Sequence, residues 1–392
     1  MDSQVSLNTR SQMCMLKNGG LEALLWGNYD MAANVLSRLS TMMLLRLKLV
    51  SKGLNDLISD RTLARLQTIR TETVCGFFYQ EMYLNNDVCA SCVSYVPWGR
   101  EDNQVCNNVL EFLPDRVTIQ AACNGLICCR SRLSSFDTMV YVCNPLRKEW
   151  NKLLLPDPNK VCSLALAFDP LKNPAHVSTH FKVVAVRNGV DDILMFNIYS
   201  SETGRWRNSE VICRCNHNLF KNKSIFAGGD LYWLTDGEEI LMLNLESELT
   251  LLVKEPLPAT EFTMTRQFCI GESEDKLHYV LLSEYGLQLW MLEDCFASQW
   301  AVKYSISLKE LEEDIPEILF NLAETLNMIL WLDLWAFKDG ILFIRVSSSV
   351  YSFDFETRKA KMLCGLSTLG ASVLFPPVVI TYSLSLVPLD EE

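Results

Sequence analysis

The sequence predicts a mainly β protein, in which a β-propeller follows a small all-α helical subdomain. Residues 30–66 hold several short amphipathic segments with helical spacing. The longer part of the chain, residues 75–390, repeats a unit of apolar strands and polar turns. The uncharged run Leu369–Leu389 alternates as a paired strand does, so the strand pattern continues to the end of this part.

The helical subdomain is expected to cover residues 26–70 and to contain four short helices. Candidate N-caps, whose side chains can accept bonds from first-turn amides, are Asp30, Thr41, Ser51 and Asp60. Apolar residues then share one side of each helix: Met31, Val35, Leu36 and Leu39; Leu44, Leu45 and Leu47; Leu54, Leu57 and Ile58; Leu63, Leu66 and Ile69. Isolated helices below about 12–15 residues are marginal. These helices must therefore bury their apolar sides on one another or on a partner, and we expect some of this surface to remain for a partner.

The β domain contains a repeat of about 50 residues. Five polar residues end corresponding strands at intervals of 56, 44, 50 and 60, namely Asn144, Ser200, Asn244, Asp294 and Asp354. Six residues after them stand Trp150, Trp206, Thr250, Trp300 and Ala360. We expect the tryptophans to pack between sheets rather than to bind a ligand. This repeat length predicts a kelch-like β-propeller of five to seven blades, each buried on its neighbours. Within this domain, Leu308–Asp314 is expected to be a loop, and a short helix is expected within the apolar run Leu319–Leu334.

The net charge of −12 is distributed unevenly, with a balance of +4 in residues 1–70 and −16 in the remainder. Affinity for nucleic acids comes mainly from cationic contacts, so the acidic domain favours a basic or neutral protein partner instead. Residues 1–25 lack a signal-peptide pattern and are expected to be a disordered lead-in. Together with 15 cysteines, this predicts an intracellular protein, cytoplasmic and/or nuclear. The run Leu369–Leu389 is better explained by a strand than by a membrane span.

Catalytic and metal-binding patterns are weak in this chain. No phosphate-binding loop, dinucleotide fingerprint, zinc-protease helix or nucleophile elbow is present. Two of the four histidines, His176 and His180, are interpreted as loop residues. The groups Cys89-x-x-Cys92 and Cys213-x-Cys215-x-His217 offer soft ligands, but a closed zinc site needs four ligands. We therefore predict no catalytic residue, cofactor or metal, while a propeller enzyme stays a disfavoured alternative.

The helical subdomain resembles the F-box of plant F-box proteins. The resemblance is carried by Val35-Leu36-Ser37-Arg38-Leu39, Leu44-Leu45-Arg46-Leu47-Lys48, Val50-Ser51-Lys52 and Leu57-Ile58-Ser59-Asp60. Three positions depart from the family pattern: Gly27-Asn28 replaces Leu-Pro, Ser40 replaces Pro, and Leu54 replaces Trp. The resemblance implies docking on a Skp-type adaptor through Met31, Val35, Leu36, Leu39, Leu44, Leu45, Leu47, Val50, Lys52, Leu54, Leu57 and Ile58. The alternative is a helical subdomain that merely packs on its own β domain.

The β domain is similar to the F-box-associated domain of plants. The matching segments include Cys123-Asn124-Gly125-Leu126, Cys143-Asn144-Pro145, Phe226–Leu234, Leu289-Trp290-Met291-Leu292, Tyr351-Ser352-Phe353-Asp354 and Tyr382–Leu389. The resemblance implies a non-catalytic substrate-recognition subunit of a Skp–cullin–F-box ubiquitin ligase. Its partners would be the adaptor, the cullin core and an unknown target protein. The alternative is a propeller scaffold whose degenerate F-box does not recruit the ligase.

Overall fold

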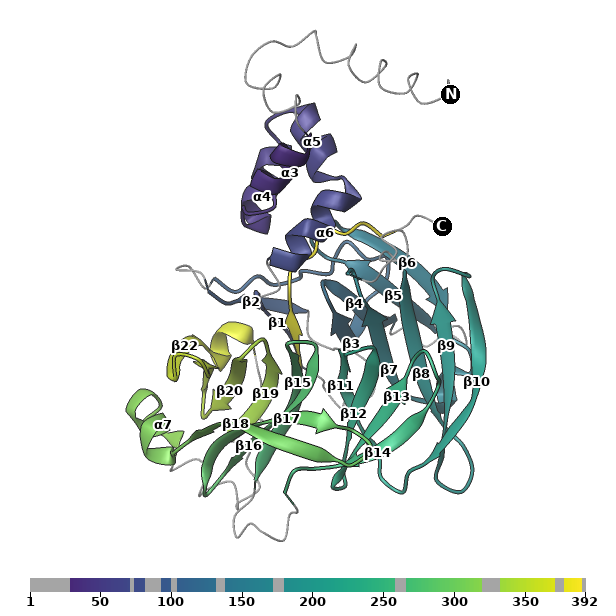
Figure 1. The fold of residues 1–392 in the computed structure, drawn as a ribbon, viewed down its shortest axis with the longest axis vertical. Helices are drawn as coiled ribbons and strands as arrows, with labels where there is room; N and C mark the ends of the chain where they lie inside the picture. Colours follow the sequence, from purple (N-terminus) through teal and green to yellow (C-terminus); the bar gives the residue numbers. More distant parts are fainter. Residues whose placement is uncertain are drawn as a thin grey trace, which may run out of the picture.

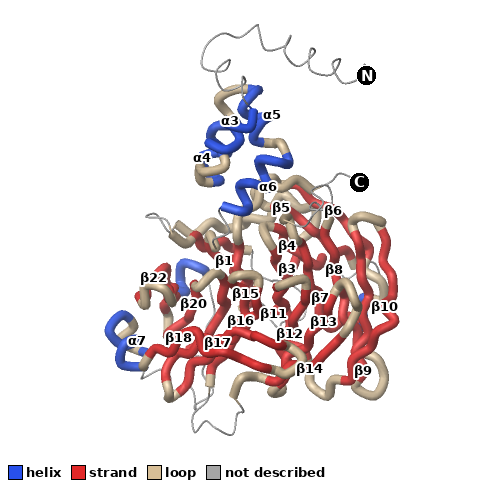
Figure 2. Tube along the Cα trace, viewed as in Figure 1, coloured by secondary structure: helices blue, strands red, loops and turns tan. Residues whose placement is uncertain are grey.

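The computed structural model describes residues 29–70, 74–81, 93–99, 104–131, 138–171, 180–257, 266–318, 332–370 and 377–389. A ring of β-sheets forms most of the molecule, and four helices form a separate group at one side of it (Figures 1 and 2). The predicted lead-in at residues 1–25 lies outside the described residues. In the ranges given, no helix combines the length and apolar character needed to cross a membrane.

The helical group consists of four short helices, α3 (Tyr29–Leu36), α4 (Thr41–Lys48), α5 (Lys52–Ile58) and α6 (Arg61–Arg70). Ser51 caps α5 as predicted, because its hydroxyl accepts from the Leu54 amide at 3.2 Å. Asp60 likewise accepts from the Thr62 amide at 2.8 Å, at the start of α6. These side chains satisfy amides that have no partner within the helix.

Two predicted caps are wrong. Asp30 lies inside α3, which already includes Tyr29. Ser40, rather than Thr41, caps α4 and accepts from the Met43 amide at 3.3 Å. Thr41 is instead buried, and its hydroxyl accepts from the Gln67 side chain of α6 at 3.3 Å. A serine and a threonine in succession can exchange these roles, and tertiary packing decides between them.

The strands described form six blades. Blade 1 has three named strands, and two blades share one eight-stranded sheet. The blades are: blade 1, β23 (Val378–Tyr382), β1 (Gly76–Gln80) and β2 (Ser94–Pro97); blade 2, β3 (Val117–Cys123), β4 (Leu126–Ser131), β5 (Met139–Asn144) and β6 (Glu149–Leu154); blade 3, β7 (Val161–Phe168), β8 (Phe181–Asn188), β9 (Ile193–Ser200) and β10 (Arg205–Arg214); blade 4, β11 (Leu219–Ala227), β12 (Asp230–Thr235), β13 (Glu239–Asn244) and β14 (Thr250–Lys254); blade 5, β15 (Gln267–Ser273), β16 (Lys276–Ser283), β17 (Gly286–Asp294) and β18 (Gln299–Ile306); blade 6, β19 (Leu332–Lys338), β20 (Ile341–Val346), β21 (Ser349–Asp354) and β22 (Lys359–Gly365). Six blades fall within the predicted range of five to seven, while the kelch-like type stays a prediction.

The two ends of the β domain meet in blade 1. Strand β23 pairs antiparallel with β1, where Phe78 lies opposite Ile380. A C-terminal strand therefore completes the blade that the N-terminal part of the domain begins. The strand predicted near the chain's end is confirmed at Val378–Tyr382. Blades 5 and 6 are joined through their inner strands, since β15 and β19 pair in parallel at Gly271 and Phe337.

The predicted turn residues occupy equivalent places in the blades. Asn144, Ser200, Asn244, Asp294 and Asp354 each end the third strand of a blade. In four of them a side-chain oxygen accepts from the amide two residues later, as at Asp294, where the distance to the Phe296 amide is 2.8 Å. This local bond stabilises the tight turn. The residues six positions later all lie in the fourth strand, as the repeat predicts.

One connection differs from the prediction. Residues Leu308–Asp314, interpreted as a loop from the sequence, form helix α7. Ser307 and Glu310 form a capping box, in which each side chain bonds to the other residue's backbone amide. The pattern Ser-x-x-Glu is a helix-start signal that the sequence already contained. A short helix was also expected within Leu319–Leu334, but its last residues begin β19, and residues 319–331 lie outside the described ranges.

Replacing Trp206 with alanine is expected to lower the free energy of unfolding by about 2–3 kcal/mol. The ring is half-buried in β10, and its centroid lies 5.5 Å from that of Tyr199 on β9. Chemical denaturation measures the change. Trp150→Ala is the control, because Trp150 is 40% exposed and its removal is expected to cost about 1 kcal/mol. Equal losses in both variants would contradict the packing role assigned to Trp206.

Candidate docking and recognition surfaces

The predicted adaptor-binding residues divide into a buried and an accessible set. Four of them are buried, namely Leu36, Leu44, Leu57 and Ile58, and form a core with Leu63 and Ala64. Four are half-buried, namely Leu39, Leu45, Leu47 and Leu54. The exposed ones are Met31, Val35, Val50 and Lys52. One face of each short helix thus holds the subdomain together, and the half-buried and exposed residues form the surface accessible to a partner.

The helices expose more large apolar side chains than the sequence predicts. Met43 is 51% exposed and Leu49 is 88% exposed, in addition to Met31 at 64%, Val35 at 55% and Val50 at 69%. These five large apolar side chains lie within 20 residues of a helical group of 42 residues. Exposing so much apolar surface to water is unfavourable and is typical of an interaction site. We define Met31, Val35, Met43, Leu49 and Val50 as the helical apolar surface. Met43 and Leu49 were not predicted from the sequence, because they lie outside the apolar side that the helical spacing of Leu44, Leu45 and Leu47 defines.

The C-terminal tail, defined here as residues 383–389, joins the helices to the propeller. Leu386, Val387 and Leu389 belong to the same apolar cluster as Leu36 and Leu44 of the helices. Blade 2 contributes Leu153 and Leu155 to this cluster. The side chain of Lys48 lies near blade 2 as well, since burial and then the nearby Arg147 charge lower its pKa. The tail therefore packs against both the helical group and the ring of blades.

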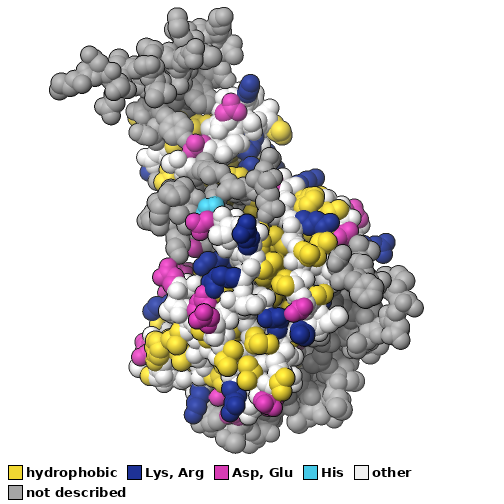
Figure 3. Space-filling model, turned by 90° about the vertical axis from the view of Figure 1, so that its right-hand side faces the viewer, with side chains coloured by type: hydrophobic (Ala, Val, Ile, Leu, Met, Phe, Trp, Pro, Cys, Tyr) yellow, Lys and Arg dark blue, Asp and Glu magenta, His cyan; other side chains and the backbone are white. Residues whose placement is uncertain are grey.

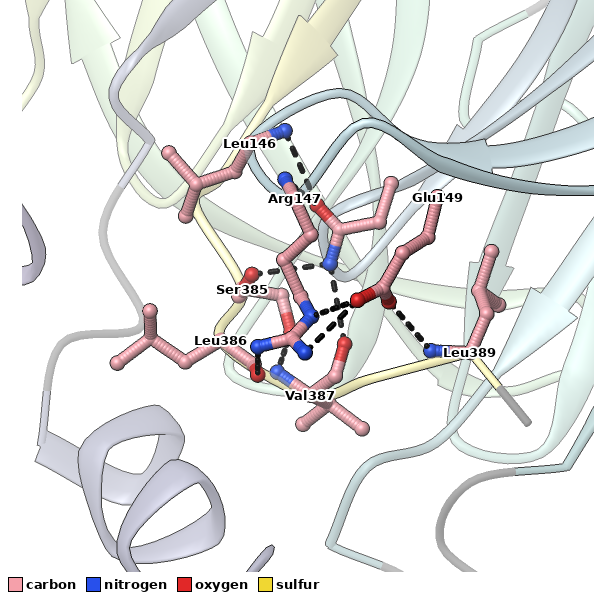
Figure 4. A network of polar contacts seen from close by, with 8 residues as sticks. Leu146, Arg147, Glu149, Ser385, Leu386, Val387 and Leu389 are labelled. Atoms are coloured by element: carbon pink, nitrogen blue, oxygen red, sulfur yellow. Dashed lines mark hydrogen bonds and ion pairs between the residues drawn. The ribbon is translucent and has the colours of Figure 1, made fainter. Parts of the chain in front are cut away.

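Polar bonds hold the C-terminal tail on blade 2 (Figure 4). Asn144 is fully buried, and its amide nitrogen donates to the carbonyls of Ser385 and Val387, both at 3.0 Å. Arg147 donates to the Leu386 carbonyl at 3.3 Å and forms an ion pair with Glu149 at 2.7 Å. Glu149 in turn accepts from the Leu389 amide at 3.1 Å. Side chains from one turn thus satisfy successive backbone groups of the tail.

Replacing Asn144 with alanine is expected to destabilise the protein by about 2–3 kcal/mol, because two buried carbonyls lose their donor. Limited proteolysis is expected to cleave the C-terminal tail faster in this variant. Asn244→Ala is the matched control, since Asn244 occupies the equivalent turn of blade 4 and donates to Asp230 instead. Equal tail cleavage in both variants would show that Asn144 does not hold the tail.

The candidate metal ligands Cys213 and Cys215 are buried at alternate positions around the end of β10. Burial raises the pKa of the Cys213 thiol to about 11, and burial also raises that of Cys215. The Cys215 thiol donates to the His217 carbonyl at 3.4 Å. Within the described residues, no group of three histidine, cysteine or carboxylate side chains is placed to hold a metal ion. Cys89, Cys92 and His176 lie outside those residues.

Charged side chains of both signs are mixed with apolar ones on the face of the molecule shown in Figure 3. Among the described side chains on this face, lysine and arginine do not gather into one basic region. The described part of the face therefore offers no continuous cationic path for a phosphate backbone.

Comparisons with known proteins agree with the ring of blades. Residues 92–341 match the family model described as F-box protein At3g26010-like, beta-propeller. The F-box protein At5g49610 of Arabidopsis thaliana is 28% identical over 231 residues, which cover 55% of this chain and 63% of that protein. The putative F-box protein At1g33530 of Arabidopsis thaliana is 25% identical over 277 residues, covering 65% of this chain and 59% of that protein. The match thus spans about three fifths of each of these relatives.

Solved structures show a weaker likeness. TolB from Acinetobacter baumannii aligns with a TM-score of 0.42 at 8% identity, covering 78% of this chain and 66% of that one. The β-propeller domain of the Trilobed protease from Pyrococcus furiosus aligns with a TM-score of 0.34 at 9% identity, covering 69% and 80%. The match to the family model covers 250 of the 392 residues. By that match, the chain belongs to the F-box protein At3g26010-like β-propeller family.

Proposed function

We propose that this protein is the substrate-recognition subunit of a Skp–cullin–F-box ubiquitin ligase inside the cell. The observation that carries the proposal is the helical apolar surface beside a propeller of an F-box protein family. In this proposal the helices dock on a Skp-type adaptor, which connects the chain to the cullin core. The propeller, kelch-like in its repeat length, binds the target protein.

The chain's contribution is positional, and none of its own residues carries out ubiquitin transfer. Holding a target beside the transfer machinery raises the effective concentration of the target's lysines there. The shared core of helices, C-terminal tail and blade 2 supports this role, because it limits how far the target can swing relative to the adaptor.

A second candidate function is a propeller scaffold that does not recruit the ligase. It is favoured by the departures from the F-box pattern. Ser40 replaces a proline and caps α4, and Leu54 replaces a tryptophan and is only half-buried. A leucine in this place offers less apolar contact area to an adaptor than tryptophan does.

Co-expression of the full chain with a plant Skp-type adaptor, followed by gel filtration, tests the proposal. We expect one peak that contains both proteins in equal amounts. Separate peaks with a folded chain would reject the ligase role and leave the scaffold function. Circular dichroism of the isolated chain shows whether it is folded.

A further inference from the structure

A cavity lies at one end of the propeller axis, where the innermost strands of the blades end. It has a volume of about 260 Å³. Every blade contributes to its wall at the end of its inner strand or the turn that follows, through Asn124, Asp169, Phe226, Glu272, Asp339 and Ser383. Figure 1 shows β3, β7, β11, β15 and β19 side by side around the centre of the ring. We call this the axial cavity.

The wall of the axial cavity is acidic. It includes the carboxylates of Asp169, Glu272, Glu274, Asp275 and Asp339. Among the described residues, three ammonium groups lie near them: Lys338 in the wall, which pairs with Glu272; Lys303, which lies 2.8 Å from Glu274; and Lys276, whose charge also acts on Glu274. The five carboxylates outnumber these ammonium groups, so the described wall carries an excess of negative charge. A cleft lined by one sign of charge concentrates ions of the opposite sign.

The protonation states of Lys338 and Glu274 follow from their neighbours. Burial by itself would lower the pKa of Lys338, but the Asp339 and Glu272 carboxylates outweigh it and raise that pKa. A hydrogen bond from Lys303 lowers the pKa of Glu274. Lys338 is therefore cationic and Glu274 anionic at neutral pH.

Backbone bonds hold two of the carboxylates in place. Asp275 on blade 5 accepts from the Gly228 amide on blade 4 at 2.8 Å. Asp169 on blade 3 accepts from the Leu171 amide at 2.9 Å. Each of these bonds uses one carboxylate oxygen. Because the side chains are ordered in advance, a ligand would not bear the entropic cost of ordering them.

A second and independent observation points to a ligand. Ser383 lines the axial cavity and is only 9% exposed. Its hydroxyl has no hydrogen-bond partner among the described residues. Buried hydroxyls are normally satisfied, because leaving one unpaired after removal from water is costly. A ligand group in the cavity would supply the missing partner.

The form of the cavity favours a polyatomic cation over a metal ion. No group of three metal-ligating side chains is placed around one point within the residues described. The carboxylates come from blades 3, 5 and 6, so the negative charge is spread around the wall. The half-buried ring of Phe226 adds an aromatic surface, which attracts organic cations. The volume is below the range of about 300–1,000 Å³ usual for drug-sized ligands and suits a single side chain.

We propose that the axial cavity binds a cationic side chain, lysine or arginine, which the target protein presents to the propeller. The inference rests on the proposed function, since it names the chemistry by which the propeller recognises its target. It also agrees with the acidic balance of residues 71–392. The recognised segment would insert one cation into the cavity and lie across the turns around it.

Three short acetylated and amidated Gly/Ser peptides test the proposal on the full chain. They carry one arginine, one lysine or one citrulline, which has the shape of arginine without its charge. Binding is measured by saturation-transfer NMR titration. We expect the citrulline peptide to bind about tenfold more weakly than at least one cationic peptide, as loss of a charged hydrogen bond predicts. The ratio between the arginine and lysine peptides identifies the preferred cation.

A charge-neutralised variant shows whether the cavity is the site. Asp169→Asn with Asp275→Asn keeps an oxygen for each backbone bond but removes two charges, so we expect the cationic peptides to bind about tenfold more weakly. The matched control is Glu202→Gln with Glu356→Gln, which removes two exposed charges outside the cavity and is expected to change affinity less than twofold. Ser383→Ala is expected to weaken binding without lowering the melting temperature, since its hydroxyl has no partner to lose.

The proposal is overturned if all three peptides bind equally or not at all, or if the cavity and control variants behave alike. Sodium chloride and calcium chloride at equal ionic strength are expected to displace the peptide equally. Selective displacement by calcium would identify a metal site and also reject the proposal. Adaptor binding is measured separately by gel filtration, so loss of the ligase role and loss of cation recognition are distinguishable.

Discussion

Replacing Gly271 with alanine is expected to lower the free energy of unfolding by about 3 kcal/mol or more. A β-carbon at Gly271 would lie 2.0 Å from the Phe337 carbonyl oxygen and 2.7 Å from its carbonyl carbon. Both contacts are with backbone, so no side chain can rotate away. Gly271 and Phe337 are partners in the parallel pair between β15 and β19, and the added carbon would force apart two inner strands.

Chemical denaturation measures this effect, with Gly365→Ala as the matched control. Gly365 also lies in a strand, but a β-carbon there would meet its nearest atom, the Ser367 hydroxyl oxygen, at 3.5 Å. That distance is an ordinary contact, so we expect a change below about 1 kcal/mol. If Gly271→Ala is no less stable than Gly365→Ala, the close approach of β15 and β19 is wrong.

Replacing Val35 with aspartate is expected to weaken adaptor binding at least about tenfold, if the helical apolar surface is the docking site. Val35 is 55% exposed on α3, so the free protein tolerates the charge. On docking, the carboxylate would lose water without gaining a partner, which is unfavourable. Surface plasmon resonance with immobilised adaptor measures the dissociation constant.

Val190→Asp is the matched control, because Val190 is 79% exposed on the loop between β8 and β9, outside the helices. We expect this variant to bind the adaptor like the unaltered chain. Leu36→Asp does not serve the purpose, since Leu36 is 7% exposed and its replacement would unfold the helical core. Unchanged binding by a folded Val35→Asp protein would exclude α3 from the adaptor interface.

The ring of blades is predictable from the sequence because its signals are local. The Asp294 side chain binds an amide two residues away, and such a turn recurs wherever the same chemistry recurs. Strand β23 was predictable for a similar reason, since its alternating pattern needs no knowledge of its partner. The capping residues of α4 were not predictable, because Gln67, far along the chain, decides what Thr41 does.

The axial cavity was not predictable from the sequence. Asp169, Asp275 and Asp339 read as ordinary polar turn residues, and they come together only when the ring closes. Likewise, the sequence places Leu36 and Val35 in one apolar stripe, while packing buries the first and leaves the second exposed. Periodicity identifies the side of a helix, but the division between core and contact surface depends on the three-dimensional arrangement of several helices.

The pairing of β23 with β1, which closes the ring in blade 1, has a consequence for synthesis in the cell. Strand β1 ends at Gln80, whereas its partner β23 begins at Val378, nearly 300 residues later. At translation rates of about 5–20 residues per second, β1 leaves the ribosome roughly 15–60 s before β23 exists. Blades 2 to 6 can assemble in order during this interval, but one edge of β1 stays unpaired. Early termination of translation would thus leave an open ring with a bare strand edge, a form that chaperones or proteases would recognise.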